Sequence, residues 1–96
     1  PTAINEVNPY ISKALLYPQP VENELNLSLE MKESARARIM LSDMSGRDRQ
    51  LLFEGTVHQG IQEFNFDIQD IIPGIYLIEF RLENTIYVKK LVKVEG

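Results

Sequence analysis

The sequence contains no cysteine and no tryptophan, and its 96 residues include a single histidine. Without cysteine there is neither a disulfide framework nor a thiolate metal site. A nucleophilic triad needs a base beside the nucleophile, and His58, in a glycine-flanked loop, is expected to be a solvated turn residue. No apolar run approaches the roughly 20 residues that a transmembrane helix needs. We therefore expect a non-enzymatic domain with no metal, no cofactor and no transmembrane segment.

Positive charge is in the minority, with ten Lys and Arg against fourteen Asp and Glu, for a net charge of −4. Nucleic-acid binding normally needs a basic face, so it is disfavoured. The charge is uneven, because residues 81–96 carry four basic and two acidic side chains. A basic end on an acidic body indicates a partner-facing C-terminus, although a solvated strand with outward lysines explains it equally well.

Apolar and polar residues alternate over four segments, which are residues 24–29, 35–42, 64–69 and 76–82. This period of two predicts strands with one buried face. Shorter strands are expected near residues 15–17 and 50–54, and a last one from residue 86. About seven strands at this spacing predict an all-β, two-sheet sandwich. Residues 1–14 show no period and contain two prolines, so they are expected to form a linker arm, with the domain at residues 15–96.

Turn chemistry falls between these segments. Gly46 suits a turn that needs positive φ, and Asp43 is expected to stabilise that turn. Pro73 and Gly74 match the central pair of a type II turn, in which Gly74 would have positive φ. Asn84 is expected to be the left-handed residue of a tight hairpin.

Four motifs follow one another along the chain: Tyr-Pro-Gln-Pro-Val at residues 17–21, Asp-Met-Ser-Gly-Arg at 43–47, Pro-Gly-Ile-Tyr at 73–76 and Lys-Lys-Leu-Val-Lys-Val at 89–94. In this order the chain resembles the type A C-terminal sorting domain of the Bacteroidetes type IX secretion system. The resemblance covers residues 15–96 and implies a seven-stranded antiparallel, immunoglobulin-like β-sandwich. The sequence departs from the family pattern at Gln19, where asparagine is usual, and continues for two residues beyond the basic ending.

The resemblance also implies a function. Such a domain is the secretion signal of a larger cargo protein, which passes through the periplasm and crosses the outer membrane to the cell surface or the medium. The implied partners are the outer-membrane translocon and its shuttle components. In many family members a surface sortase then cleaves upstream of the domain and anchors the cargo to lipopolysaccharide, so residues 1–14 would hold or adjoin the cleavage region.

The resemblance and the charge pattern assign recognition to the last strand, through Lys89, Lys90, Leu91, Val92, Lys93 and Val94. An edge strand can add to a partner's sheet, or to a second copy of the chain. The same lysines would also block edge-to-edge aggregation. The other motif residues are expected to be structural: Tyr17, Pro18, Pro20, Asp43, Gly46, Pro73, Gly74 and Tyr76.

Two alternatives stay open. The domain could be retained uncleaved as a docking module of the surface attachment machinery. It could also be a carbohydrate-binding or adhesive sandwich, in which tyrosines stack on a sugar.

Overall fold

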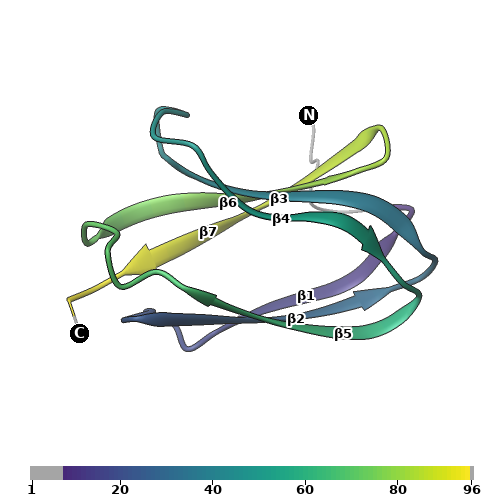
Figure 1. Cartoon of the computed structure of the whole chain (residues 1–96), viewed down its shortest axis with the longest axis horizontal. Coiled ribbons are helices and arrows are strands. Elements are labelled where there is room, and N and C mark those ends of the chain that lie inside the picture. Colours follow the sequence, from purple (N-terminus) through teal and green to yellow (C-terminus); the bar gives the residue numbers. More distant parts are fainter. Residues whose placement is uncertain (1–7, 96) are drawn as a thin grey trace.

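The computed structural model describes residues 8–95, which form seven strands and no helix. The strands are β1 (Ile11–Tyr17), β2 (Glu24–Met31), β3 (Ala35–Asp43), β4 (Gln50–Val57), β5 (Gly60–Asp67), β6 (Gly74–Leu82) and β7 (Thr85–Lys93). They pair antiparallel in two sheets, with the orders β1-β2-β5 and β4-β3-β6-β7. The two sheets pack face to face (Figure 1), so the predicted seven-stranded β-sandwich is confirmed.

The core lies between the two sheets, as the alternation predicts. On β2, Leu25, Leu27 and Leu29 are fully buried, while the polar residues between them point outward. On the opposite sheet Ile39 and Phe80, which are directly paired across β3 and β6, are also fully buried. Burying an aliphatic or aromatic side chain of this size contributes about 1.5–3 kcal/mol. These residues hold the sandwich together without any disulfide.

The fold begins earlier than expected. Residues 8–14, assigned from the sequence to a linker arm, carry the start of β1, and Ile11 and Ala14 are buried in the core. The side chain of Asn8 accepts hydrogen bonds from the backbone N–H of Tyr10 and Ile11 at 2.9 and 3.2 Å. A β-bulge between Ile11 and Lys13 breaks the period of two, which explains why the alternation missed this strand. Residues 1–7 of the expected arm lie outside the described residues.

Two turn predictions are wrong in detail. Gly74 does not have positive φ; it opens β6 in extended conformation, paired with Lys93, so it is not the third residue of a type II turn. The two-residue β6–β7 hairpin forms as expected, but its left-handed residue is Glu83, with φ of 55°, rather than Asn84. The Glu83 carboxylate and N–H both bond the backbone of Arg36, at 2.8 and 3.0 Å. This contact with β3 fixes the position of Glu83 in the hairpin.

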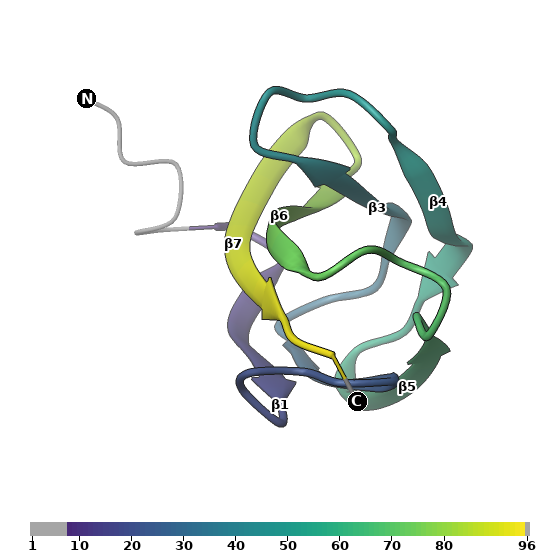
Figure 2. The same ribbon diagram turned by 90° about the vertical axis from the view of Figure 1, so that its left-hand side faces the viewer.

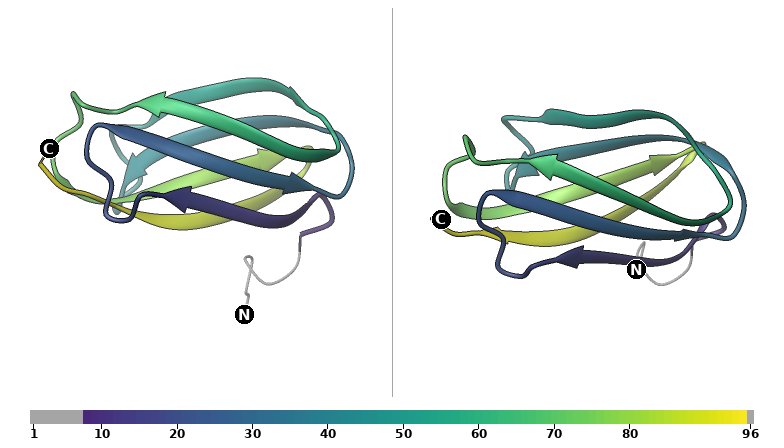
Figure 3. Two further views of the ribbon diagram at one scale, coloured as in Figure 1. Left: turned by 90° about the horizontal axis from the view of Figure 1, so that it is seen from below. Right: turned by 60° about the horizontal axis from the view of Figure 1, so that its bottom comes forward.

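All the connections that contain motif residues lie at one end of the sandwich. Figure 2 looks along the molecule from this side, and Figure 1 shows the same loops gathered near the C-terminus. We call this end, formed by residues 18–23, 44–49, 68–73 and 94–95, the C-terminal end. Figure 3 shows the three-stranded sheet from below, with the β1–β2 connection turning back at this end.

Candidate functional site

The four sequence motifs, spread over 78 residues of chain from Tyr17 to Val94, converge at the C-terminal end. The first follows β1, the second follows β3, the third precedes β6 and the fourth completes β7. Antiparallel pairing places Asp43 opposite Tyr76 and Gly74 opposite Lys93, so three of the motifs are neighbours in one sheet. The sequence shows these motifs one after another but does not show that they meet in space.

The first motif connects the two sheets at this end. Its Tyr17–Pro18 and Gln19–Pro20 peptide bonds are both cis, and Val21, which follows them, is fully buried. The Val21 N–H donates to the Val92 carbonyl at 2.8 Å, and the Val94 N–H donates to the Val21 carbonyl at 2.8 Å. This two-bond contact is a parallel bridge against β7. The Tyr-Pro-Gln-Pro-Val motif therefore holds the last motif in place.

The second motif is a turn held by one carboxylate. Asp43 Oδ1 accepts hydrogen bonds from the Ser45 N–H at 3.0 Å, the Ser45 hydroxyl at 2.7 Å and the Arg47 N–H at 2.8 Å. Gly46 has φ of 85°, a conformation that a side chain would strain. The hydrogen bonds from Ser45 and Arg47 lower the pKa of Asp43. Asp43 and Gly46 therefore lie in the turn that the sequence predicts for them.

The third motif ends in a tyrosine that bonds back to its own chain. The Tyr76 hydroxyl donates to the Ile72 carbonyl, four residues upstream. Burial, followed by the nearby carboxylates of Asp48 and Asp43, raises the pKa of Tyr76, so its hydroxyl stays protonated and able to donate. A tyrosine near the start of a strand with this bond forms the tyrosine corner of immunoglobulin-type sandwiches. Tyr76 therefore positions the β5–β6 connection, where Pro73 lies.

The fourth motif differs from the expected row of exposed lysines. Lys93 is only 4% exposed, and its Nζ donates to the Val94 carbonyl at 3.2 Å. Lys89 is half-buried on the same inward face, because strand side chains alternate, and only Lys90 is exposed. The picture of three solvated lysines along this edge is therefore wrong, because the inward face of β7 takes two of them. Recognition through this strand stays a prediction.

The edge of β7 is also less open than expected. Val21 occupies the backbone groups of Val92 and Val94 at its C-terminal part. A partner strand, or a second copy of the chain, cannot add to those same groups unless it displaces Val21.

Exposed apolar side chains at this end were missed from the sequence. Ile72 is 76% exposed, and Met44, Ile75 and Tyr17 are also exposed, all on or beside the C-terminal end. Exposed apolar side chains of this size at one end of a small domain make that end a candidate interaction surface. Their signal in the sequence was an apolar residue beside turn residues, as in Met44 next to Ser45 and Ile72 next to Pro73.

The residues considered for catalysis or for sugar binding do not come together in the described part of the chain. His58 is exposed between β4 and β5, at the end opposite to the motifs. Tyr10, Tyr76 and Tyr87 are partly buried against the core, and Tyr17 bonds Glu63, so the four tyrosines form no common stacking surface. No cluster of three or more potential metal ligands occurs within residues 8–95. That same span has no helix long and apolar enough to cross a membrane.

The seven-stranded antiparallel sandwich is the fold that the resemblance to C-terminal sorting domains implied. The family described as the secretion system C-terminal sorting domain matches residues 15–94. The chain belongs to this family, as the resemblance to type IX secretion domains predicted. A sorting signal of this kind implies export to the cell surface or the medium.

Solved structures show the same fold. The chain is similar to dimeric latent PorU from Porphyromonas gingivalis, with a TM-score of 0.67 and 17% identity, covering 95% of this chain and 10% of that one. It is also similar to a beta-glucosidase from Kluyveromyces marxianus, with a TM-score of 0.52 and 14% identity, covering 88% of this chain and 14% of that one. At such identities the likeness is one of fold. Comparison with curated proteins gives no match.

Proposed function

We propose that this domain is the secretion signal of a larger cargo protein and is recognised by the type IX secretion machinery during passage across the outer membrane. We also propose that the domain has no catalytic activity of its own. Membership of the sorting-domain family supports the proposal most directly. The periplasm is the compartment of transit, and the outer-membrane translocon and its shuttle components are the partners. Release of the domain by a surface sortase, with anchoring of the cargo, completes the proposed sequence.

We place the surface that the secretion machinery recognises, which we call the readable surface, at the C-terminal end. The motif residues there are held by local hydrogen bonds within two turns and by the long-range bonds of Val21 with Val92 and Val94, so the exposed side chains on them are presented in one geometry. Preorganised side chains lose less conformational entropy when a partner binds. Ile72 and Met44 are apolar and exposed, which suits a protein partner.

A reporter fusion tests the proposal. A signal peptide, a reporter and residues 1–96 are joined in that order and expressed in a bacterium that carries this secretion system. We expect the reporter at the cell surface or in the medium, and retention in the periplasm would contradict the proposal. Mass spectrometry of the delivered reporter then separates cleavage from retention, because an uncleaved C-terminus favours the retained docking module.

Two matched variants test the readable surface. Ile72 and Ile61 are both exposed isoleucines, at 76% and 65%, but Ile61 is the second residue of β5, at the opposite end of the sandwich. We expect Ile72→Ser to reduce delivery and Ile61→Ser to leave it unchanged, with both domains equally folded. Equal delivery by the two variants would show that Ile72 is not part of the recognised surface.

A further inference from the structure

A positively charged surface lies on the outer face of the sheet β4-β3-β6-β7. Four of the five arginines of the chain reach it: Arg36 and Arg38 from β3, Arg49 from the position just before β4 and Arg81 from β6. We call these four residues the arginine face. The outer face of the other sheet carries Glu24, Glu30, Glu63 and Asp67 beside one lysine, Lys13, and no arginine. The two sides of the sandwich therefore carry opposite charge.

Two members of the arginine face oppose each other directly. Arg38 and Arg81 are cross-strand partners in the antiparallel β3–β6 pair. Like charges at directly opposite positions destabilise a sheet. An uncharged residue at either position would remove this repulsion.

The local carboxylates neutralise the arginines only in part. Glu79 pairs with both Arg49 and Arg81, at 3.0 and 3.2 Å. Glu54 lies 3.7 Å from Arg38, a long contact between two exposed side chains. Within residues 8–95, no carboxylate forms an ion pair with the guanidinium of Arg36; Glu83 reaches only its backbone N–H. The arginine face keeps net positive charge on a domain whose total charge is −4.

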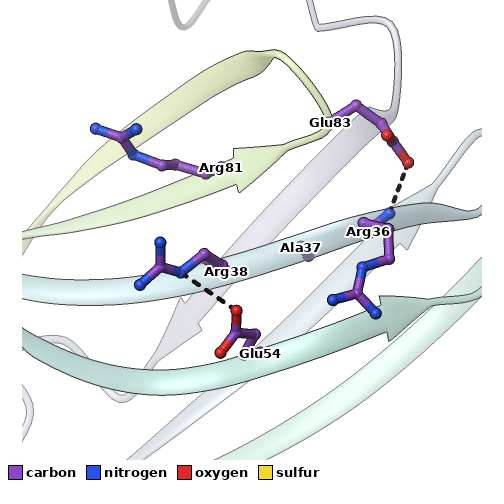
Figure 4. A pocket seen from close by; sticks show the side chains of 6 residues that line it. All are labelled: Arg36, Ala37, Arg38, Glu54, Arg81 and Glu83. Atoms are coloured by element: carbon purple, nitrogen blue, oxygen red, sulfur yellow. Dashed lines mark hydrogen bonds and ion pairs between the residues drawn. The ribbon is translucent and has the colours of Figure 1, made fainter.

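A shallow hollow separates these side chains. It has a volume of about 320 Å³ and is lined by Arg36, Ala37, Arg38, Glu54, Arg81 and Glu83. Figure 4 shows Arg38 and Arg81 on adjacent strands, with Arg36 further along β3 and the small Ala37 between the two arginines of that strand. The guanidinium groups surround a space that a ligand can enter from the solvent.

We propose that the arginine face binds an acidic, extended polypeptide segment of a partner protein. Guanidinium groups bind carboxylates through paired hydrogen bonds, and arginine is enriched in protein interfaces where lysine is depleted. Arg36 and Arg38 are two residues apart on one strand, which separates their Cα atoms by about 7 Å. Carboxylates on alternate residues of an extended peptide have the same spacing.

A protein segment fits this surface better than a membrane or a nucleic acid, whose negative charge is uniform. Glu54, Glu79 and Glu83 are interleaved with the arginines, so a membrane or nucleic acid laid across the face would meet carboxylates as well as guanidiniums. A peptide can place its carboxylates only where the arginines are. The proposal goes beyond the sorting function, because it concerns a separate surface and can fail while the domain still directs export.

The test uses the 96-residue chain and a peptide in which glutamate alternates with serine. Binding is followed by changes in the amide NMR spectrum at low salt. We expect weak, saturable binding that moves the signals of β3 and β6 and is lost as sodium chloride is added. A peptide of the same composition, with its glutamates in one block, is expected to bind less tightly.

Matched variants locate the site. The double change Arg36→Gln with Arg81→Gln is expected to weaken binding at least about threefold, the loss of two partly exposed ion pairs. Arg47→Gln removes an arginine that lies in the β3–β4 turn outside the hollow, and it is expected to bind as the unchanged protein does. The double change Arg36→Lys with Arg81→Lys keeps the charge and the side-chain length and loses only the planar guanidinium groups. It therefore supplies a folded variant, and its binding is also expected to weaken.

Three results would overturn the proposal. One is undiminished peptide binding by the Arg36 and Arg81 double variants. Another is equal binding of the alternating and the block peptide, which would leave only unspecific attraction. The third is a response to inorganic phosphate or to vesicles containing phosphatidylglycerol, at the same residues, when neither peptide binds.

Discussion

The C-terminal end and the arginine face use their polar groups in opposite ways. At the C-terminal end, Asp43 and Tyr76 form hydrogen bonds that hold local turns, and the backbone of Val21 bonds the distant last strand. On the arginine face, Arg38 and Arg81 repel each other and Arg36 contributes no ion pair within the described chain. We therefore expect changes at the first region to affect folding and the proposed recognition together, and changes at the second to affect binding with little effect on folding.

The largest expected effect tests whether the last strand belongs to the core. Leu91 is fully buried in β7, and its neighbour Lys90 is exposed. We expect Leu91→Ala to lower the free energy of unfolding by about 2–5 kcal/mol, because it removes buried volume from the core. Lys90→Ala should change it by less than about 0.5 kcal/mol. Urea unfolding measures both, and equal values would show that β7 is peripheral.

The next effect concerns the tyrosine corner. Tyr76→Phe removes the hydroxyl that donates to the Ile72 carbonyl, and we expect a loss of about 0.5–1.5 kcal/mol in the free energy of unfolding. Tyr87→Phe is the matched control, because the Tyr87 ring packs against Phe80 and its hydroxyl forms no hydrogen bond within residues 8–95. Thermal unfolding of the two variants gives the difference. A larger effect at Tyr87 would contradict the role given to Tyr76.

A smaller, pH-dependent effect follows from Asp43. Its pKa is lowered in the folded state, so its contribution to stability is present above its unfolded pKa of 3.8 and is lost as the pH falls through the folded pKa. We expect Asp43→Asn to be less stable than the unchanged protein at neutral pH, and the difference to shrink in strong acid. Asp70→Asn, at the same end but without a side-chain hydrogen bond in the described residues, should show no such convergence. Urea unfolding across this pH range measures all three proteins.

The smallest effect is expected on the arginine face. Arg81→Gln should change the free energy of unfolding by less than about 0.5 kcal/mol, since it loses an exposed ion pair and also relieves the repulsion from Arg38. A double-mutant cycle with Arg38→Gln should give an unfavourable coupling of roughly 0.2–1 kcal/mol. A favourable coupling would mean that the two guanidiniums support each other in the folded sheet.

Local patterns predicted the sheets well. Alternation identified the strands whose inward side chains are uniformly apolar, such as β2 with its three leucines. Alternation failed at the start of β1, where a bulge shifts the register. The turn prediction failed at Gly74, whose conformation is set by pairing with Lys93 rather than by the preceding proline. The hairpin residue Glu83 was misassigned because its contact with Arg36, on another strand, outweighs the local preference of asparagine for the left-handed region.

The candidate site was less predictable because it depends on contacts between distant residues. Charge counting found the lysines of β7 but not that Lys93 faces inward. The alternation placed Arg36 and Arg38 on one face of β3, yet only the β3–β6 register brings Arg81 beside them. In each case the missing information is how strands pair, which no short segment contains.

The bridge between Val21 and the last strand determines when, during synthesis, the C-terminal end can form. Both of its hydrogen bonds require Val92 or Val94, so neither can form until synthesis has passed these residues. A chain cut short within β7 by a premature stop codon, or clipped there by a protease, loses these bonds and the buried Leu91 beside them. The C-terminal end is then incomplete, so a partner that binds the exposed groups of this end selects domains whose last strand is present.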